Sequence, residues 1–298
     1  MTVAWVFPGQ GSQKIGMAKQ VQNLSNTEER FSYASEIFER NLFEICELNS
    51  EPSNSLYDLN NTRNTQICLF LIESILLDAL KDKGMKPNYV AGHSLGEITA
   101  LYCAEVFSFE DCVSLIKVRS ELMVSAGKGS MAAVIGFDRN QLELLVKKID
   151  DIVIANDNSS SQVVLSGSNE ALDNLSKEIT CKRFLKLNVS GAFHSPLMKE
   201  PSIKFSEYLK QIKFQNPLFP VISNYDPTLC SDPNELKIRL ENQMCNGVRW
   251  RETMDLMAKD SNLHIVEIGP SNVLSGLGKR HLKDIKISQV SSSDKLTY

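Results

Sequence analysis

The 298-residue sequence has no long uninterrupted apolar run, and this absence argues against a membrane-spanning segment. Its most apolar stretch, residues 67–72, is soon followed by Glu73 and Asp78. The first residues carry no basic region, so a secretory signal is not expected either. With 42% hydrophobic residues the chain can bury a large core. We therefore expect a globular cytoplasmic protein with no membrane partner.

Cysteine and histidine follow neither a disulfide pattern nor a metal-binding pattern. The seven cysteines are odd in number and include no C-x-x-C pair, which is typical of reduced thiols in the cytoplasm. None of the four histidines pairs with cysteines or carboxylates at metal-ligand spacing, so no metal is expected. The net charge of −4 argues against a general nucleic-acid binder.

The most informative segment that is present is GHSLGE at residues 92–97, which follows a strand-like stretch and precedes a helical one. It matches the nucleophile elbow, in which a serine, here Ser94, is held exposed on a sharp turn between a strand and a helix. The amide of Leu95 would lie at the helix N-terminus, where it can stabilise an oxyanion. The alternative is a turn whose serine is only an N-cap.

A second glycine-bearing loop, residues 8–13, follows a predicted buried strand at residues 3–7. The next glycine is Gly16, so the loop fits neither the dinucleotide-binding pattern nor the P-loop. We expect no permanently bound cofactor.

The order of predicted elements indicates an α/β fold with two domains. Helical periodicity dominates from about residue 27 to 84, and buried parallel strands are predicted at 221–223 and 264–268. Between residues 127 and 190, the order of predicted elements is β-α-β-β-α-β, which is that of a ferredoxin-like unit, with its last strand at residues 183–189. We predict a hydrolase-like large domain with a parallel sheet, residues 1–126 and 191–298, and an inserted ferredoxin-like small domain, residues 127–190.

A serine nucleophile needs a general base, and histidine has a suitable pKa. His93 adjoins Ser94 on the turn and should point away from it. His264 lies in an apolar strand, and His281 lies in a basic segment expected to be solvated. His194 remains, in the loop that returns from the small domain to the large one, where ligand sites are favoured. No acid is evident as a third member, so a carbonyl oxygen could orient the imidazole.

One cation falls on the buried face of a predicted helix that follows the N-cap Ser108 and ends near residue 126. Arg119 lies at helical spacing from Cys112, Ile116 and Met123. A buried guanidinium keeps its charge and needs an anionic partner. The residues alone favour an internal aspartate or glutamate, and the alternative is a carboxylate on a substrate.

Together these segments resemble the malonyl-CoA:acyl-carrier-protein transacylases of fatty acid synthesis and the related acyltransferases of polyketide synthases. The resemblance covers nearly the whole chain. Its motifs are FPGQGSQ at 7–13, the elbow, VRSELM at 118–123, GAFHS at 191–195, and a glutamine before VRW at 248–250. Residues 158–162 lack the family's proline, and Gly247 stands where proline is common. Both departures concern loop stiffness.

The resemblance assigns a role to each site residue. Ser94 would be acylated, and His194 would be its base. The main-chain carbonyl of Gln243 would orient the imidazole, and the amides of Gln10 and Leu95 would bind the oxyanion.

For Arg119 the resemblance reverses the preference for an internal partner, because in the family this guanidinium clamps the free carboxylate of malonyl. An acetyl group would leave it buried and unpaired. Phe193, before the histidine, resembles malonyl-selective relatives, and its bulk should crowd an α-methyl group.

The expected reaction is ping-pong transfer of malonyl from malonyl-CoA to the phosphopantetheine thiol of an acyl carrier protein, through a malonyl-serine ester. Carrier proteins are typically acidic, so Lys182, Arg183 and Lys186 on the small domain's last strand are candidates for docking. A solvated strand face is the alternative.

Two other functions remain open. An acyl hydrolase that clears carrier proteins would act on uncharged groups and is disfavoured by Arg119. A non-catalytic carrier-binding scaffold would need neither Ser94 nor His194. The carrier could serve fatty acid or polyketide synthesis, and the loop around Phe193 looks more like the stand-alone polyketide enzymes. We expect a monomer.

Overall fold

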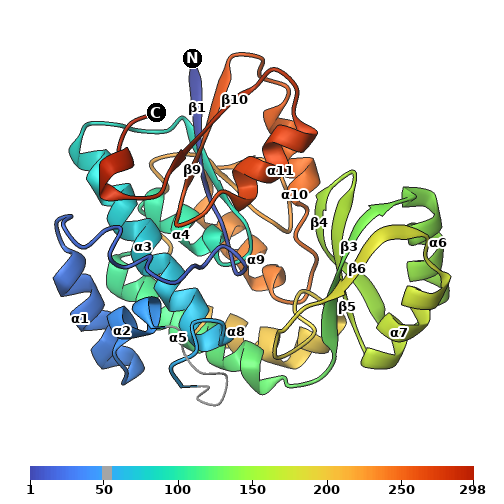
Figure 1. Ribbon diagram of the computed structural model, residues 1–298. Coiled ribbons are helices and arrows are strands. Elements are labelled where there is room, and N and C mark those ends of the chain that lie inside the picture. Colours follow the sequence, from blue (N-terminus) through green and yellow to red (C-terminus); the bar gives the residue numbers. More distant parts are fainter. Residues whose placement is uncertain (49–55) are drawn as a thin grey trace.

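Two β-sheets organise the chain, and the computed structural model describes them and their connections over residues 1–48 and 56–298 (Figure 1). The larger sheet contains β1 (Thr2–Phe7), β2 (Tyr89–Gly92), β7 (Val221–Ile222), β8 (Leu229–Cys230), β9 (Leu263–Ile268) and β10 (Lys286–Val290). Its strand order is β10-β9-β1-β2-β7-β8. All neighbours pair in parallel except β7 and β8, which confirms the predicted parallel sheet.

The central strands of this sheet are buried along most of their length, as expected for strands covered on both faces. β1 lies between β9 and β2 and is buried from Ala4 to Phe7. All six residues of β9 are buried as well. The carboxyl ends of β1 and β2 therefore bring the loop at residues 8–13 and the elbow to the same edge of the sheet.

Helices pack on both sides of this sheet. They are α1 (Thr27–Phe38), α2 (Leu42–Glu47), α3 (Thr62–Asp82), α4 (Gly96–Cys103), α5 (Phe109–Ser125), α8 (Lys199–Leu209), α9 (Pro233–Gln243), α10 (Trp250–Met257) and α11 (Val273–His281), with single 3-10 turns at Pro196–Met198 and Ser293–Lys295. α5 begins at a capping box formed by Ser108 and Asp111, so the predicted N-cap is confirmed. In the part of the chain that the structure describes, no helix is long and apolar enough to cross a membrane.

The smaller sheet contains β3 (Ser130–Phe137), β4 (Ile152–Ser159), β5 (Gln162–Gly167) and β6 (Cys181–Lys186), with α6 (Arg139–Lys148) and α7 (Asn169–Glu178). Its order is β4-β5-β3-β6 and every pair is antiparallel, which confirms the ferredoxin-like connectivity. The last strand is displaced from its predicted range, since β6 ends at Lys186.

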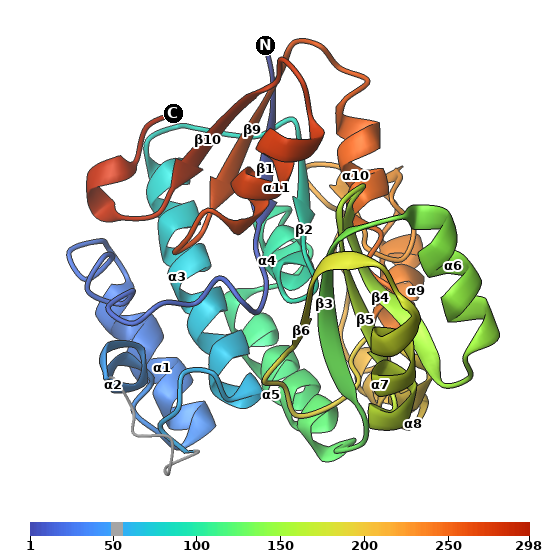
Figure 2. The same ribbon diagram turned by 45° about the vertical axis from the view of Figure 1, so that its right-hand side comes forward.

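Alternation along β3 decides what each face of this sheet contacts. Ala132 and Val134 pack in a core with residues of α6 and α7. Met131 and Ala133, on the opposite face, line a cavity shared with the larger sheet's loops. Figure 2 shows the result, with α6 and α7 on the side of the small sheet that is remote from the large one.

Candidate active site

The elbow between β2 and α4 holds Ser94 with a φ of 54°, in the left-handed region that non-glycine residues rarely adopt. Its two glycines allow the backbone to pass very close to its neighbours. A Cβ on Gly96 would lie 2.1 Å from the carbonyl oxygen of Phe7, and one on Gly92 would lie 1.9 Å from the backbone of Gly96. The turn therefore requires glycine at both positions, and it presents the serine side chain to the cavity.

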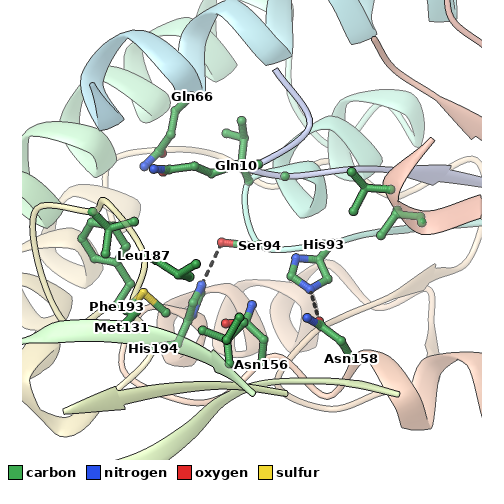
Figure 3. A pocket seen from close by; sticks show the side chains of 18 of the residues that line it. Gln10, Gln66, His93, Ser94, Met131, Asn156, Asn158, Leu187, Phe193 and His194 are labelled. Atoms are coloured by element: carbon green, nitrogen blue, oxygen red, sulfur yellow. Dashed lines mark hydrogen bonds between the residues drawn. The ribbon is translucent and has the colours of Figure 1, made fainter. Parts of the chain in front are cut away.

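Ser94 and His194 meet although 100 residues separate them (Figure 3). The serine Oγ lies 2.8 Å from Nε2 of the imidazole. The imidazole Nδ1 lies 2.9 Å from the main-chain carbonyl oxygen of Gln243. Because a carbonyl can only accept, Nδ1 carries the proton and donates it to this oxygen. The lone pair of Nε2 then faces the serine hydroxyl, which can donate to it.

The electrostatic surroundings keep this imidazole neutral. Burial lowers the pKa of His194 to about 3, the nearby positive charge of Arg119 acts in the same direction, and the hydrogen bond to the Gln243 carbonyl opposes both. At neutral pH the side chain is therefore in the form that can accept a proton.

Two main-chain amides in the lining of the cavity are candidates for an oxyanion hole. Gln10 and Leu95 line the same cavity as Ser94, and within residues 1–48 and 56–298 neither N–H has a hydrogen-bond acceptor. Gly9 allows the close approach of the first loop, because a Cβ there would lie 2.4 Å from the carbonyl oxygen of His93. Two free donors that line the same cavity as a serine nucleophile are suited to an oxyanion hole.

Arg119 projects from α5 into the site and is 1% exposed. Its Nη1 donates to Oε1 of Gln66 at 2.7 Å. Its Nη2 donates to Oε1 of Gln243 at 2.8 Å and to Oγ of Ser94 at 3.2 Å. Burial lowers the pKa of Arg119 to about 10, and the negative charge of Glu97 partly offsets this.

A direct ion pair with an internal carboxylate, which the residues alone favoured for Arg119, is therefore wrong, since no described carboxylate lies at salt-bridge distance from it. The guanidinium has neutral amide and hydroxyl partners instead. A buried cation beside the nucleophile, without a direct counter-ion, is suited to bind an anionic group.

The site opens into a cavity of about 280 Å³ between the two sheets. The small sheet contributes Met131, Ala133 and Val164 to an apolar wall, which continues through Leu187 and Phe193 (Figure 3). Phe193 is 4% exposed and directly precedes the base. Its role in selecting the acyl group stays a prediction.

The other histidines lie away from the serine hydroxyl. His93 points from the elbow toward the small sheet, where its Nε2 is 2.8 Å from Oδ1 of Asn158 (Figure 3). His264 is buried and lies 2.8 Å from the hydroxyl of Ser288. The prediction of a solvated His281 is wrong, because this side chain is half-buried and bonded to a carboxylate of α10 at 2.7 Å. No cluster that could hold a metal ion is found among the described side chains.

The three basic residues of β6 do not share one face. Lys186 pairs with a carboxylate of α7 at 2.5 Å. Lys182 lies four residues before Lys186 and therefore on the same side of the strand, since side chains alternate between its two faces. Arg183 alternates to the other side together with Leu185, which is paired with the cavity-lining Ala133. Of the three, Arg183 alone projects from the cavity side of the sheet.

Three further residues support the site and were not singled out from the sequence. Gln66 holds Arg119, and its signal is a polar residue within the buried apolar run of α3. Asn224 follows β7 and ties the elbow down: its Oδ1 accepts from the Ser94 amide at 2.6 Å. Glu97, the last residue of the elbow motif, accepts from the Gln243 side chain at 2.7 Å.

Comparisons with known proteins agree with this geometry. A family model described as acyl transferase domain matches residues 4–295. A malonyl CoA-acyl carrier protein transacylase of Synechocystis is 43% identical over 99% of both chains, and one of Staphylococcus aureus is 36% identical over 96% of this chain and 94% of the relative.

Solved structures are similar over the same length. The Synechocystis malonyl-CoA:ACP transacylase superposes with a TM-score of 0.93 at 42% identity, covering 99% of both chains. A malonyl-transacylase in complex with a type II polyketide synthase acyl-carrier protein superposes with a TM-score of 0.91 at 32% identity, covering 99% of this chain and 98% of the other.

Proposed function

The chain belongs to the malonyl-CoA–acyl carrier protein transacylase family, and from this premise we propose that it transfers malonyl from malonyl-CoA to the phosphopantetheine thiol of an acyl carrier protein. One observation carries the proposal: a buried Arg119, which has no direct counter-ion among the described residues, lies 3.2 Å from the hydroxyl that contacts His194. This combination joins an acyl-accepting nucleophile to a site for a carboxylate.

In the first half-reaction Oγ of Ser94 attacks the thioester carbonyl of malonyl-CoA while Nε2 of His194 accepts the hydroxyl proton. The amides of Gln10 and Leu95 donate to the oxygen that becomes negative. The tetrahedral intermediate collapses with cleavage of the carbon–sulfur bond. His194 returns its proton to the leaving sulfur, so coenzyme A departs as a thiol and malonyl remains as a serine ester.

The second half-reaction reverses these steps with a different thiol. The phosphopantetheine sulfur of the carrier attacks the ester carbonyl while His194 accepts the thiol proton. When the ester bond breaks, His194 delivers this proton to Oγ of Ser94. The free enzyme and malonyl-carrier result, and the malonyl carboxylate stays on Arg119 throughout.

Intact-protein mass spectrometry tests the proposal. Wild-type protein mixed with malonyl-CoA should acquire one malonyl group, which added holo-carrier protein should remove while itself gaining the mass. A hydrolase would instead lose an uncharged acyl group to water. A scaffold would acquire no adduct from either malonyl-CoA or acetyl-CoA.

Replacing Arg119 with alanine should lower kcat/KM for malonyl-CoA about 100-fold and leave acetyl-CoA much less affected, because only malonyl loses a charge-assisted contact. Steady-state rates with both thioesters measure this ratio. A matched control is Arg239→Gln, a buried arginine that pairs with carboxylates outside the cavity. Equal losses with both substrates would contradict the carboxylate role.

The lowered pKa of His194 predicts a pH profile. An unperturbed histidine titrates near pH 6.5, whereas this imidazole should stay neutral, and kcat/KM should stay flat, from about pH 8 down to about pH 5. In Arg119→Gln one cause of the lowering is gone, so the acid limb should move up toward 6.5. A wild-type limb near 6.5, or a limb that does not move in the variant, would contradict this account.

The same electrostatics couple the substrate to the base. A malonyl carboxylate on Arg119 compensates the positive charge that lowers the pKa of His194. The bound substrate therefore strengthens the base that deprotonates the serine.

Three further properties belong to the proposal. Arg183 is the basic residue of β6 best placed to meet an acidic carrier near the cavity. A monomer suffices, because one chain supplies the nucleophile, the base and the carboxylate site. A cytoplasmic setting is supported by the seven cysteines, all of which are free.

A further inference from the structure

Two buried charges flank the side-chain amide of Gln243. Arg119 and Glu97 are each 1% exposed. The Gln243 Oε1 accepts from Nη2 of Arg119 at 2.8 Å, and its Nε2 donates to Oε2 of Glu97 at 2.7 Å. The amide dipole is thus aligned, with its oxygen toward the cation and its N–H toward the anion. The two charged groups do not contact each other directly, and the neutral Gln243 side chain lies between them.

Among the described residues, neither Glu97 nor Arg119 has a direct ion-pair partner. In the described parts of the chain, Glu97 forms no salt bridge, and its Oε2 also accepts from the amide of Asn224 at 3.1 Å. Burial raises the pKa of the Glu97 carboxyl, whereas its contacts with Gln243, Asn224 and Ser223 and the positive charge of Arg119 lower it. The Oε1 of Glu97 and the Nε of Arg119 are buried without hydrogen-bond partners. Isolated charges are costly to bury, so the two groups stabilise one another across the amide. A direct ion pair would stabilise them more, but it would occupy the guanidinium that the substrate needs.

We propose that Glu97 is the counter-charge of Arg119 in the unloaded enzyme, acting through Gln243, and that this separated pair tunes the preference between dicarboxylic and uncharged acyl groups. The inference rests on the proposed malonyl transfer. Glu97 does not touch the substrate and is a positioning residue.

The charge of Glu97 affects the two acyl groups in opposite ways. A malonyl carboxylate on Arg119 is a second negative charge near Glu97, so Glu97 weakens its binding. An acetyl group brings no charge and displaces water from the cavity, so Arg119 then depends on Glu97 alone. Removing the charge of Glu97 should favour malonyl and disfavour acetyl.

Glu97→Gln is the decisive variant, because an amide oxygen at the place of Oε2 can still accept from Gln243 and Asn224 while the charge is lost. The ratio of kcat/KM for malonyl-CoA to that for acetyl-CoA should rise about tenfold. A merely structural role would lower both rates together and leave the ratio unchanged, and that result would overturn the proposal.

The matched control is Glu73→Gln. Glu73 is also fully buried and accepts a hydrogen bond from Thr99 at 2.5 Å, but within residues 1–48 and 56–298 no hydrogen bond links it to Arg119. This control should leave the ratio unchanged. In an Arg119→Gln background, Glu97→Gln should also leave it unchanged, and a persisting tenfold rise there would overturn the proposal.

A double-mutant cycle of thermal unfolding gives a readout without substrate. Glu97→Gln should lower the unfolding temperature more in the wild type than in Arg119→Gln, because only in the wild type does it leave the buried charge of Arg119 without a counter-charge. If the single variant does not fold, the double variant should. Equal destabilisation in both backgrounds, or failure of both to fold, would overturn the proposal. Absence of malonyl transfer by the wild type would instead refute the proposed function, and the cycle would still be interpretable.

Discussion

Replacing Ser94 with alanine is expected to abolish the malonyl adduct and to lower transfer to the carrier by roughly 10⁵-fold. The hydroxyl oxygen is the atom that forms the ester. Its two contacts, with Arg119 and with Nε2 of His194, both belong to the site. Alanine keeps the Cβ and the backbone of the elbow. The loss should therefore be chemical, with the unfolding temperature little changed.

Intact-protein mass spectrometry and a carrier-malonylation assay measure this prediction. Ser125→Ala is a suitable control, because Ser125 is an exposed serine at the end of the helix that carries Arg119. An undiminished adduct on Ser94→Ala would place the nucleophile elsewhere. Undiminished biological function without an adduct would favour the scaffold alternative.

Replacing His194 with alanine should lower the rate of acylation by roughly 10³- to 10⁴-fold, because the serine then has no base within hydrogen-bond reach. His93 cannot replace it, since its Nε2 is directed to Asn158. Pre-steady-state acylation with malonyl-CoA measures the effect directly. The binding of malonyl-CoA should be affected much less than the rate.

His281→Gln is the matched control, because this histidine lies on α11 and bonds to a carboxylate of α10. A loss of less than tenfold in His194→Ala would mean that another group accepts the serine proton. The variant also separates the two partners of the serine hydroxyl, since Arg119, which donates to Oγ, would remain 3.2 Å from it and could orient it without deprotonating it.

Some of the site could be predicted because its causes are local. The elbow needs glycine at two positions where a Cβ would collide with backbone, and such a need leaves a short pattern in the chain. The ferredoxin-like unit was recognisable because alternation and element order are properties of neighbouring residues. The burial of Arg119 followed from helical spacing alone.

Other features depended on which side chains the fold brings together. Spacing showed that Arg119 is buried but not that its partners are two amides, because Gln66 and Gln243 come from separate helices. The basic residues of β6 formed one group in the sequence, yet the pleat directs Lys186 and Arg183 to opposite faces. When an edge strand carries charges on both faces, the sequence pattern does not show which of them lie on the cavity side.

The sequence by itself determined the fold class, the serine on the elbow and the presence of a buried cation, because backbone sterics and hydrophobic periodicity act over a few residues. The tertiary structure alone decided the contact between Ser94 and His194, and the placement of Glu97 one amide away from Arg119. These contacts join residues about 100 or more positions apart along the chain. Hydrogen bonds of that range follow from the packing of whole elements, which no local pattern encodes.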